Sequence, residues 1–211
     1  MTSLTKPTEE LRAGLKTQLG DVLDAFDAGA TALGARAWPA KAAGDRAPDF
    51  ELPDARGGTV ALRDALAAGP VVLVFYRGAW CPYCNLQLRA FQAALDEIRA
   101  AGASPIAISP ETPDNSLTLA EQAGLAFPVL SDAGNAVARS YGIVFDLAGA
   151  DRDLHAGVGA DLVEFNGDDS WELPAASVFV VGRDGIITFA SVAGDYRWRV
   201  GPDEVLAALR L

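Results

Sequence analysis

The sequence predicts an α/β fold in which a central mixed β-sheet is flanked by helices and preceded by a helical extension. Residues 71–76 (VVLVFY) form a continuous apolar, β-branched run, which is typical of a strand buried on both faces. Strand and helix patterns alternate after this run, and residues 178–181 and 186–190 then predict a hairpin. Before the run, apolar residues between positions 8 and 36 recur at the spacing of one helical face, which predicts a long amphipathic helix.

The remaining elements follow from local start and stop signals. Residues 81–100 predict a helix that Gly102 ends, and Asp132 is expected to cap a helix over 133–141. Residues 146–173 are rich in glycine and aspartate without periodicity, so we expect a long loop there. The other expected elements are strands at 49–52, 59–62, 105–109, 127–130 and 143–145, a helix from Asp114 or Asn115 through 122, and a last helix from Pro202 through 209.

The chain is expected to divide into two parts. Residues 1–46 form a helical extension and linker, in which Thr8 caps the long helix and the stretch from Trp38 to Pro48 reads as a linker. Residues 47–211 form the main domain. We expect the extension to pack on that domain or on a second subunit, which leaves a homodimer open.

Composition and charge narrow the function classes. The formal net charge of -11 repels phosphate backbones, so we expect no nucleic-acid partner. The first residues are polar and lack the apolar core of a targeting peptide. The run at 71–76 is far too short to cross a bilayer, so we expect no membrane association and a cytoplasmic protein. Thiols are usually kept reduced in that compartment.

The chemistry is expected at the only two cysteines, Cys81 and Cys84. They follow a buried strand and open a helix, where unpaired backbone N–H groups and the helix dipole stabilise a thiolate and lower its pKa. Pro82 suits the first turn because its missing N–H costs nothing there. Side chains three residues apart on a helix lie roughly 5–6 Å apart at Cβ, so modest rotamer changes bring the sulfurs into disulfide geometry.

Two other interpretations of the pair fit the sequence less well. Half of a zinc site would need four ligands, and the only histidine, His155, lies far away in sequence. Two inert buried cysteines would not explain a proline between them or their place at a strand-to-helix junction. A catalytic redox pair accounts for both features.

Six further positions are candidates for a role near the pair or elsewhere in the chain. Arg77 is expected either to stabilise a thiolate or a developing peroxide charge, or to be a surface arginine. Trp80 is expected to cover the sulfur, to be a core aromatic, or both. Tyr83 is expected to be exposed. His155 is expected to be a solvated loop residue rather than a base, and Asp168-Asp169 a turn rather than an acid pair.

The segment from Phe75 to Leu86 (FYRGAWCPYCNL) resembles the active-site turn of thioredoxin-fold proteins. More narrowly, it is similar to bacterial peroxiredoxin-like proteins of the alkyl hydroperoxide reductase/thiol-specific antioxidant (AhpC/TSA) family. The resemblance covers most of residues 47–211 and implies a thioredoxin-like fold. Four downstream segments share it, namely 108–110, 125–132, 165–171 and 179–185.

The resemblance assigns the cysteines in two ways. The peroxiredoxin pattern Pro-x-x-x-Thr-x-x-Cys places the peroxidatic cysteine on Cys84, its threonine on Cys81 and its proline on Arg77. The thioredoxin pattern makes Cys81 the nucleophile instead. Thioredoxins also carry a proton-transferring acid where this chain has Phe75. Many thioredoxin-fold proteins have a cis-proline where this chain has Ala176, so we expect a trans peptide there.

The function implied by the resemblance is an antioxidant, thiol-dependent peroxidase that reduces hydrogen peroxide or organic hydroperoxides. Cys84 is taken as peroxidatic and Cys81 as resolving, with a thioredoxin- or glutaredoxin-like reductant restoring the dithiol. The first alternative is a general dithiol–disulfide oxidoreductase that uses Cys81 as nucleophile. The second is a non-enzymatic redox sensor. No metal, flavin or nucleotide cofactor is expected, because no motif supports one.

Overall fold

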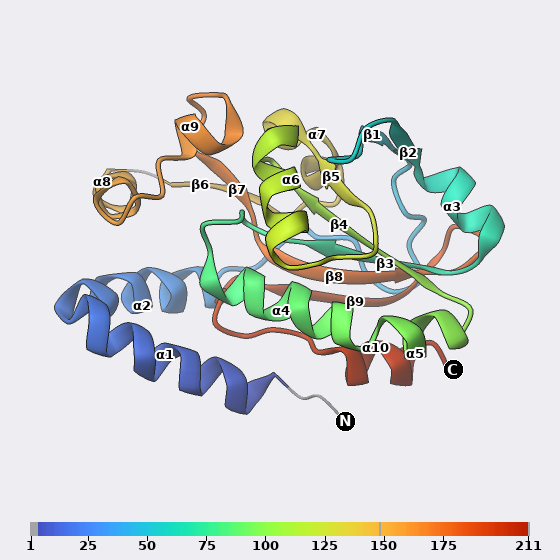
Figure 1. Ribbon diagram of the computed structural model, residues 1–211, viewed down its shortest axis with the longest axis horizontal. Coiled ribbons are helices and arrows are strands. Elements are labelled where there is room, and N and C mark those ends of the chain that lie inside the picture. Colours follow the sequence, from blue (N-terminus) through green and yellow to red (C-terminus); the bar gives the residue numbers. More distant parts are fainter. Residues whose placement is uncertain (1–3, 148, 211) are drawn as a thin grey trace.

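The fold is built on a five-stranded mixed sheet in the order β5-β4-β3-β8-β9. The computed structural model describes residues 4–147 and 149–210. The strands β3, β4 and β5 run parallel, whereas β8 pairs antiparallel with β3 and β9 antiparallel with β8 (Figure 1). The predicted hairpin and central strand are therefore confirmed. The five strands are β3 (Val71–Phe75), β4 (Ser104–Ser109), β5 (Val129–Ser131), β8 (Ala176–Val181) and β9 (Ile187–Ala193).

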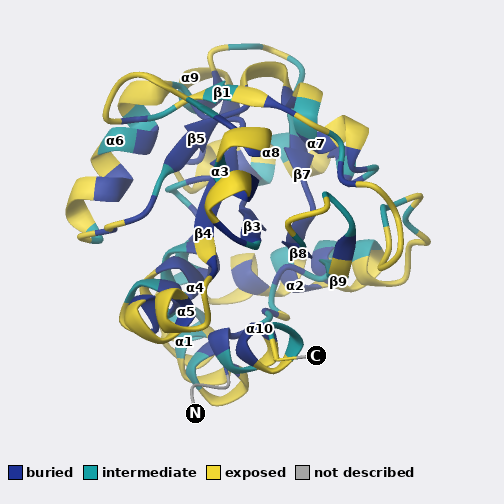
Figure 2. Cartoon of the chain, turned by 90° about the vertical axis from the view of Figure 1, so that its right-hand side faces the viewer, coloured by how far each residue is buried: buried dark blue, intermediate teal, exposed yellow. Residues whose placement is uncertain are grey.

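The sheet has a hydrophobic core on each face, because successive side chains of a strand point to opposite sides. Val72 and Val74 of β3 belong to one core, together with Leu88 and Phe91 of α4 (Pro82–Ala93). The alternate β3 residues belong to the second core, which includes residues of α3 (Leu62–Ala68) and α7 (Ala136–Ser140). Every residue of β3 is buried, and Figure 2 shows this strand in the buried colour.

The other elements surround this sheet. Pro82, Pro113 and Pro202 are each the first residue of a helix, as expected for proline in a first turn. Two small antiparallel sheets lie beside the main one. Further elements are β1 (Glu51–Pro53) with β2 (Thr59–Ala61), β6 (Val144–Asp146) with β7 (Glu172–Pro174), α5 (Leu95–Ala100), α6 (Pro113–Gln122), the 3₁₀ turn η1 (Ala133–Asn135) and α10 (Pro202–Ala208).

The helical extension is a hairpin of two helices, α1 (Thr5–Leu19) and α2 (Asp21–Gly34), rather than the single helix predicted. Gly20 separates them with a φ of 56°, a left-handed backbone angle that interrupts a right-handed helix and that glycine adopts without strain. Thr8 lies inside α1 and donates its hydroxyl to the carbonyls of Leu4 and Thr5, so it is not the cap. Figure 1 shows α1 lying beside α4, with α2 packed on α1.

Two further local predictions were wrong, and one helix was missed. The helix expected over 81–100 is interrupted at Ala94, which separates α4 from α5. The helix α3 was not predicted. The expected loop at 146–173 contains α8 (Ala150–Gly157) and α9 (Leu162–Asn166), short helices whose glycine- and aspartate-rich composition hides them. Tertiary contacts stabilise such short helices, since α8 packs on α2.

Candidate active site

The two cysteines take different positions at the start of α4. Cys81 is the N-cap residue, with extended backbone angles, and the Cys84 and Asn85 N–H groups donate to its carbonyl. Cys84 lies inside the first turn and is completely buried. Both are free thiols. The predicted arrangement at a strand-to-helix junction is confirmed, and both thiols are buried.

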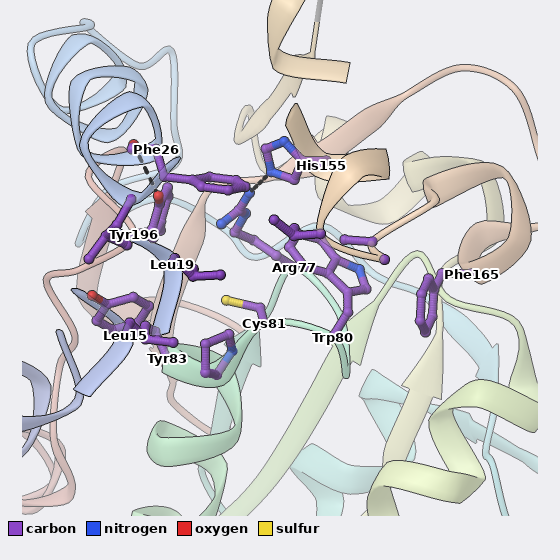
Figure 3. A pocket seen from close by; sticks show the side chains of 15 residues that line it. Leu15, Leu19, Phe26, Arg77, Trp80, Cys81, Tyr83, His155, Phe165 and Tyr196 are labelled. Atoms are coloured by element: carbon purple, nitrogen blue, oxygen red, sulfur yellow. Dashed lines mark hydrogen bonds between the residues drawn. The ribbon is translucent and has the colours of Figure 1, made fainter. Parts of the chain in front are cut away.

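Cys81 lines a cavity of about 360 Å³, and its side chain is directed into this space (Figure 3). The cavity is bounded mostly by apolar and aromatic side chains. Leu15, Leu19, Leu23 and Phe26 of the helical hairpin lie on one side, and Tyr196 lies beside them because its hydroxyl donates to the Phe26 carbonyl. Trp80 and Phe165 lie across the cavity from the hairpin. Only 1% of the Cys81 surface is exposed, so a reactant must enter this cavity to meet its sulfur.

Arg199 contacts both sulfurs. Its Nη2 lies 3.4 Å from Cys84 Sγ and 3.8 Å from Cys81 Sγ. Its Nε donates to the Tyr196 carbonyl at 2.7 Å, and Nη1 donates to Gln87 Oε1 at 3.2 Å. These bonds fix a buried guanidinium against the thiol pair. A positive charge at that place favours ionisation of a sulfur.

The surroundings make the two thiols unequal. Burial opposes ionisation of Cys81, but a hydrogen bond from the Cys84 thiol and the charges of Arg77 and Arg199 hold the pKa of Cys81 well below its ordinary value. Burial raises the pKa of the Cys84 thiol well above its ordinary value, and the bond to Cys81 adds to this. The thiolate is therefore favoured on Cys81, the sulfur that faces the cavity.

Arg77 is buried at 3% exposure, so the surface alternative for this residue is wrong. Its backbone N–H donates to Cys84 Sγ at 3.4 Å. Its guanidinium carbon lies 4.7 Å from the centre of the Trp80 ring and 4.2 Å from that of Tyr196. Trp80 lines the cavity that Cys81 enters and packs against the core, while its predicted role as a cover of the sulfur stays a prediction.

His155 and Tyr83 correct two sequence-based expectations. His155 is 4% exposed on α8, and its Nε2 lies 2.7 Å from Arg77 Nη2, so it is not a solvated loop residue. Burial and the neighbouring Arg77 lower the pKa of His155 to about 4. Tyr83 is 3% exposed because α1 lies against α4, so the expectation of an exposed tyrosine was wrong. The sequence does not show that α1 covers the part of α4 that carries Tyr83.

Glu111 is a buried acid beside the active-site turn. Its Oε1 accepts the Ala79 N–H at 2.8 Å, and its Oε2 has no partner among the described residues. Burial is the main reason that the pKa of Glu111 is raised to about 8, and the hydrogen bond from the Ala79 N–H opposes this shift. Sequence reasoning missed this residue. One signal could have found it, because Glu111 follows β4 as Cys81 follows β3, at the same edge of two parallel strands.

The remaining candidates lie outside this cluster. The Ser170 N–H donates to Asp168 Oδ1 at 2.9 Å, which confirms a turn at Asp168-Asp169. Ala176 begins β8 in a chain whose described peptide bonds are all trans, as expected. Across residues 4–147 and 149–210, no group of three or more His, Cys, Asp or Glu side chains could hold a metal ion. No helix in this part is long and apolar enough to span a membrane.

A family model described as the AhpC/TSA family matches residues 43–190, more than half of the chain. The chain belongs to the AhpC/TSA family. It is similar to a Mycobacterium tuberculosis protein that carries the name of a peroxiredoxin, with 38% identity over 99 residues, 47% of this chain and 62% of that protein. It is 34% identical over 106 residues to the chloroplastic peroxiredoxin Q of Populus jackii, covering 50% of this chain and 49% of that protein. The chain thus spans about half to five-eighths of these relatives.

Solved structures share the thioredoxin-like fold of this chain. The crystal structure of peroxidoxin BcpB from Mycobacterium tuberculosis is 28% identical, with a TM-score of 0.64, over 80% of this chain and 96% of that one. Peroxiredoxin Q of Xanthomonas campestris shares the fold at 24% identity and a TM-score of 0.56, over 76% of this chain and 89% of that one.

Part of the site of this AhpC/TSA protein lies outside the family match. The matched range ends at residue 190, whereas Tyr196 and Arg199 come after it. The hairpin residues Leu19 and Phe26 come before it. No sequence motif marks Arg199, and nothing in the sequence places residue 199 near residue 84. The segments before and after the matched range therefore supply Arg199 and part of the cavity wall around the two cysteines.

Proposed function

We propose that the chain is a thiol-dependent peroxidase that reduces hydroperoxides through Cys81 and Cys84. The observation that carries this proposal is the position of Cys81, an ionisable sulfur at the end of a small cavity with a second thiol directly behind it. The AhpC/TSA membership and the peroxiredoxin names of the relatives support the same reaction class.

The proposed cycle has three steps. The Cys81 thiolate attacks one peroxide oxygen, so that the O–O bond breaks, Cys81 becomes a sulfenic acid and the alkoxide or hydroxide leaves with a proton as alcohol or water. The Cys84 thiol then attacks the Cys81 sulfur; an S–S bond forms and water leaves. A dithiol reductant finally exchanges with the disulfide, which restores both thiols while the reductant becomes a disulfide.

Cys81 is proposed as the attacking sulfur, which reverses the preference drawn from the peroxiredoxin pattern. Three features favour it: the position at the helix N-terminus, the side chain in the cavity, and the lowered pKa of its thiol. Cys84 is completely buried and its thiol has a raised pKa, which suits a resolving thiol. The assignment with Cys84 as peroxidatic remains the alternative.

The cavity favours small reactants. Hydrogen peroxide and compact organic hydroperoxides fit a space of about 360 Å³, and the apolar side chains around it suit an organic group. A thioredoxin- or glutaredoxin-like protein remains the proposed physiological reductant. Because Cys81 is 1% exposed, such a protein reaches the sulfur only after the helical hairpin moves.

Stopped-flow mixing of the reduced protein with one equivalent of hydrogen peroxide or cumene hydroperoxide tests the proposal. Trp80 adjoins the pair, so tryptophan fluorescence reports the reaction. We expect a fast phase in the parent protein and in Cys84→Ser, and none in Cys81→Ser. A phase that survives in Cys81→Ser and disappears in Cys84→Ser would establish the reverse assignment. Reaction no faster than a free thiol with either peroxide, in every form, contradicts peroxidase function.

A dithiol–disulfide oxidoreductase is the second candidate function. The observation that favours it is that Cys81 stands where the peroxiredoxin pattern has a threonine. Cys81 is also the cysteine whose thiol has the lowered pKa. The same stopped-flow experiment with hydroxyethyl disulfide in place of peroxide separates the two candidates. Rapid reaction with the disulfide and none with either peroxide would favour the second.

A further inference from the structure

The single histidine of the chain makes two hydrogen bonds that determine its protonation. Its Nδ1 lies 2.7 Å from the Asp151 carbonyl oxygen, and its Nε2 lies 2.7 Å from Arg77 Nη2. A carbonyl only accepts hydrogen bonds and a guanidinium only donates them. Both partners therefore require the same neutral form, in which Nδ1 carries the proton and Nε2 accepts from Arg77.

Aromatic packing fixes the position of this imidazole. The Phe26 ring of α2 meets it edge-on at 5.0 Å between ring centres, and the Trp80 ring does so at 5.5 Å. Phe26 comes from the helical hairpin and Trp80 from the active-site turn. His155 thus lies between these two parts of the cavity wall, as Figure 3 shows.

Arg77 carries a charge that no acid neutralises. In the part of the chain that the structure describes, Arg77 takes part in no ion pair, and its guanidinium is flanked by the rings of Trp80 and Tyr196. A carboxylate in the place of His155 would hold the guanidinium but cancel its field at Cys81. A neutral imidazole holds it and leaves its charge effective.

We propose that His155 is a positioning residue, which holds the Arg77 guanidinium at the cavity that the Cys81 side chain enters, so that the charge of Arg77 acts on the Cys81 sulfur. The use of the Cys81 thiolate in catalysis rests on the proposed function. The effect of His155 on the Cys81 pKa does not, because it can be measured without any peroxide. It assigns His155 no direct contact with a reacting atom. It also links α8 and the helical hairpin to the reactivity of the sulfur.

The test is the thiol titration of Cys81 in a Cys84→Ser background, where Cys81 is the only thiol. Thiolate absorbance at 240 nm and the rate of iodoacetamide alkylation are followed against pH. Asparagine at position 155 is too short to reach Arg77, whereas glutamine can place a carbonyl oxygen near the position of Nε2. We expect His155→Asn to raise the apparent pKa of Cys81 by about one unit, a tenfold loss of thiolate at a pH well below that pKa. We expect His155→Gln to keep it close to the parent value.

The same titration in an Arg77→Met background tests whether His155 acts through Arg77. If His155 acts through Arg77, His155→Asn causes no further shift once Arg77 is absent. Equal titrations of the Asn and Gln variants, or the same shift by His155→Asn with and without Arg77, would overturn the proposal. Circular dichroism verifies that each variant folds. The comparison of His155→Asn with His155→Gln uses two polar replacements, so its outcome does not depend on an apolar side chain that could disturb folding. Peroxidase failure in the parent protein would leave this titration result unaffected.

Discussion

Arg199 Nη2 donates to Cys84 Sγ at 3.4 Å, although 115 residues separate the two in sequence. The same nitrogen lies 3.8 Å from Cys81 Sγ, so one cation serves both thiols of the pair. Gln87 and the Tyr196 carbonyl hold the guanidinium in place. A residue that belongs to neither the strand nor the helix of the cysteine motif thus places a positive charge beside both sulfurs.

Replacement of Arg199 by methionine is expected to raise the apparent pKa of Cys81 and to slow the reaction with peroxide by about tenfold or more. The loss of a buried cation next to a thiolate removes roughly 1–3 kcal/mol of stabilisation of the charged form. Thiolate absorbance at 240 nm and stopped-flow rates measure the two effects. Arg89→Met is the control, because Arg89 is exposed on α4 and its loss changes the net charge equally. Equal effects of both variants would contradict a local role for Arg199.

Stability is expected to fall as pH rises from about 4.5 to about 8, because of Glu111. Burial raises the pKa of Glu111 from 4.5 to about 8, so in this range the unfolded chain releases a proton that the folded chain retains. The corresponding loss is at most roughly 5 kcal/mol. Urea unfolding across this range measures it. Glu111→Gln keeps a carbonyl oxygen for the Ala79 N–H and removes the titration, so its stability should vary less with pH. A parallel pH dependence of both proteins would exclude this role.

Filling the cavity is expected to lower kcat/KM for large peroxides more than for small ones. Leu19→Trp places extra volume in the space that leads to Cys81, so kcat/KM for cumene hydroperoxide should fall about tenfold, an effect of roughly 1.4 kcal/mol, while that for hydrogen peroxide changes little. Val22→Trp is the matched control, since Val22 is 40% exposed on α2 and lies outside this cavity. Loss of both activities in Leu19→Trp with an unchanged fold would show that the cavity does not select by size.

Two glycine substitutions should have opposite effects on stability. A Cβ at Gly194 would lie 2.2 Å from the Leu33 carbonyl oxygen, so Gly194→Ala must displace α2 from the segment after β9 and should cost about 1–3 kcal/mol. Gly14 lies in α1 with nothing within 4 Å of the corresponding position, so Gly14→Ala should stabilise by about 0.5–1 kcal/mol. Denaturant midpoints at constant m-value measure both. A stable Gly194→Ala would show that the hairpin is free to shift there.

The sheet and the cysteine turn could be predicted because their signals are local. The apolar run at 71–76 specifies a doubly buried strand, and Pro82 with two cysteines marks the helix start that follows. The hairpin at 176–193 likewise follows from two apolar runs and a turn between them. Each of these features needs only neighbours within a few residues.

The rest of the site depends on contacts that no local pattern encodes. Arg199 meets the sulfurs through a bend after β9, and His155 meets Arg77 because α8 packs on α2. Composition also misled, because the glycine- and aspartate-rich stretch before β7 contains two short helices held by packing. The split of the extension at Gly20 was missed because helical periodicity continues across it. The boundary between extension and domain at residue 47 stays a prediction.

The placement of Cys84 in the same helical turn as Cys81 has a consequence for damage by excess oxidant. A sulfenic acid on Cys81 would form three residues from its partner thiol, so ring closure needs no unfolding of α4 and no approach of a second subunit. The sulfenic acid would therefore be consumed quickly, and the irreversible passage to sulfinic and sulfonic acids requires a second oxidant molecule to arrive first. The protein should accordingly retain its thiols through repeated exposure to peroxide concentrations that inactivate an enzyme with a distant resolving cysteine.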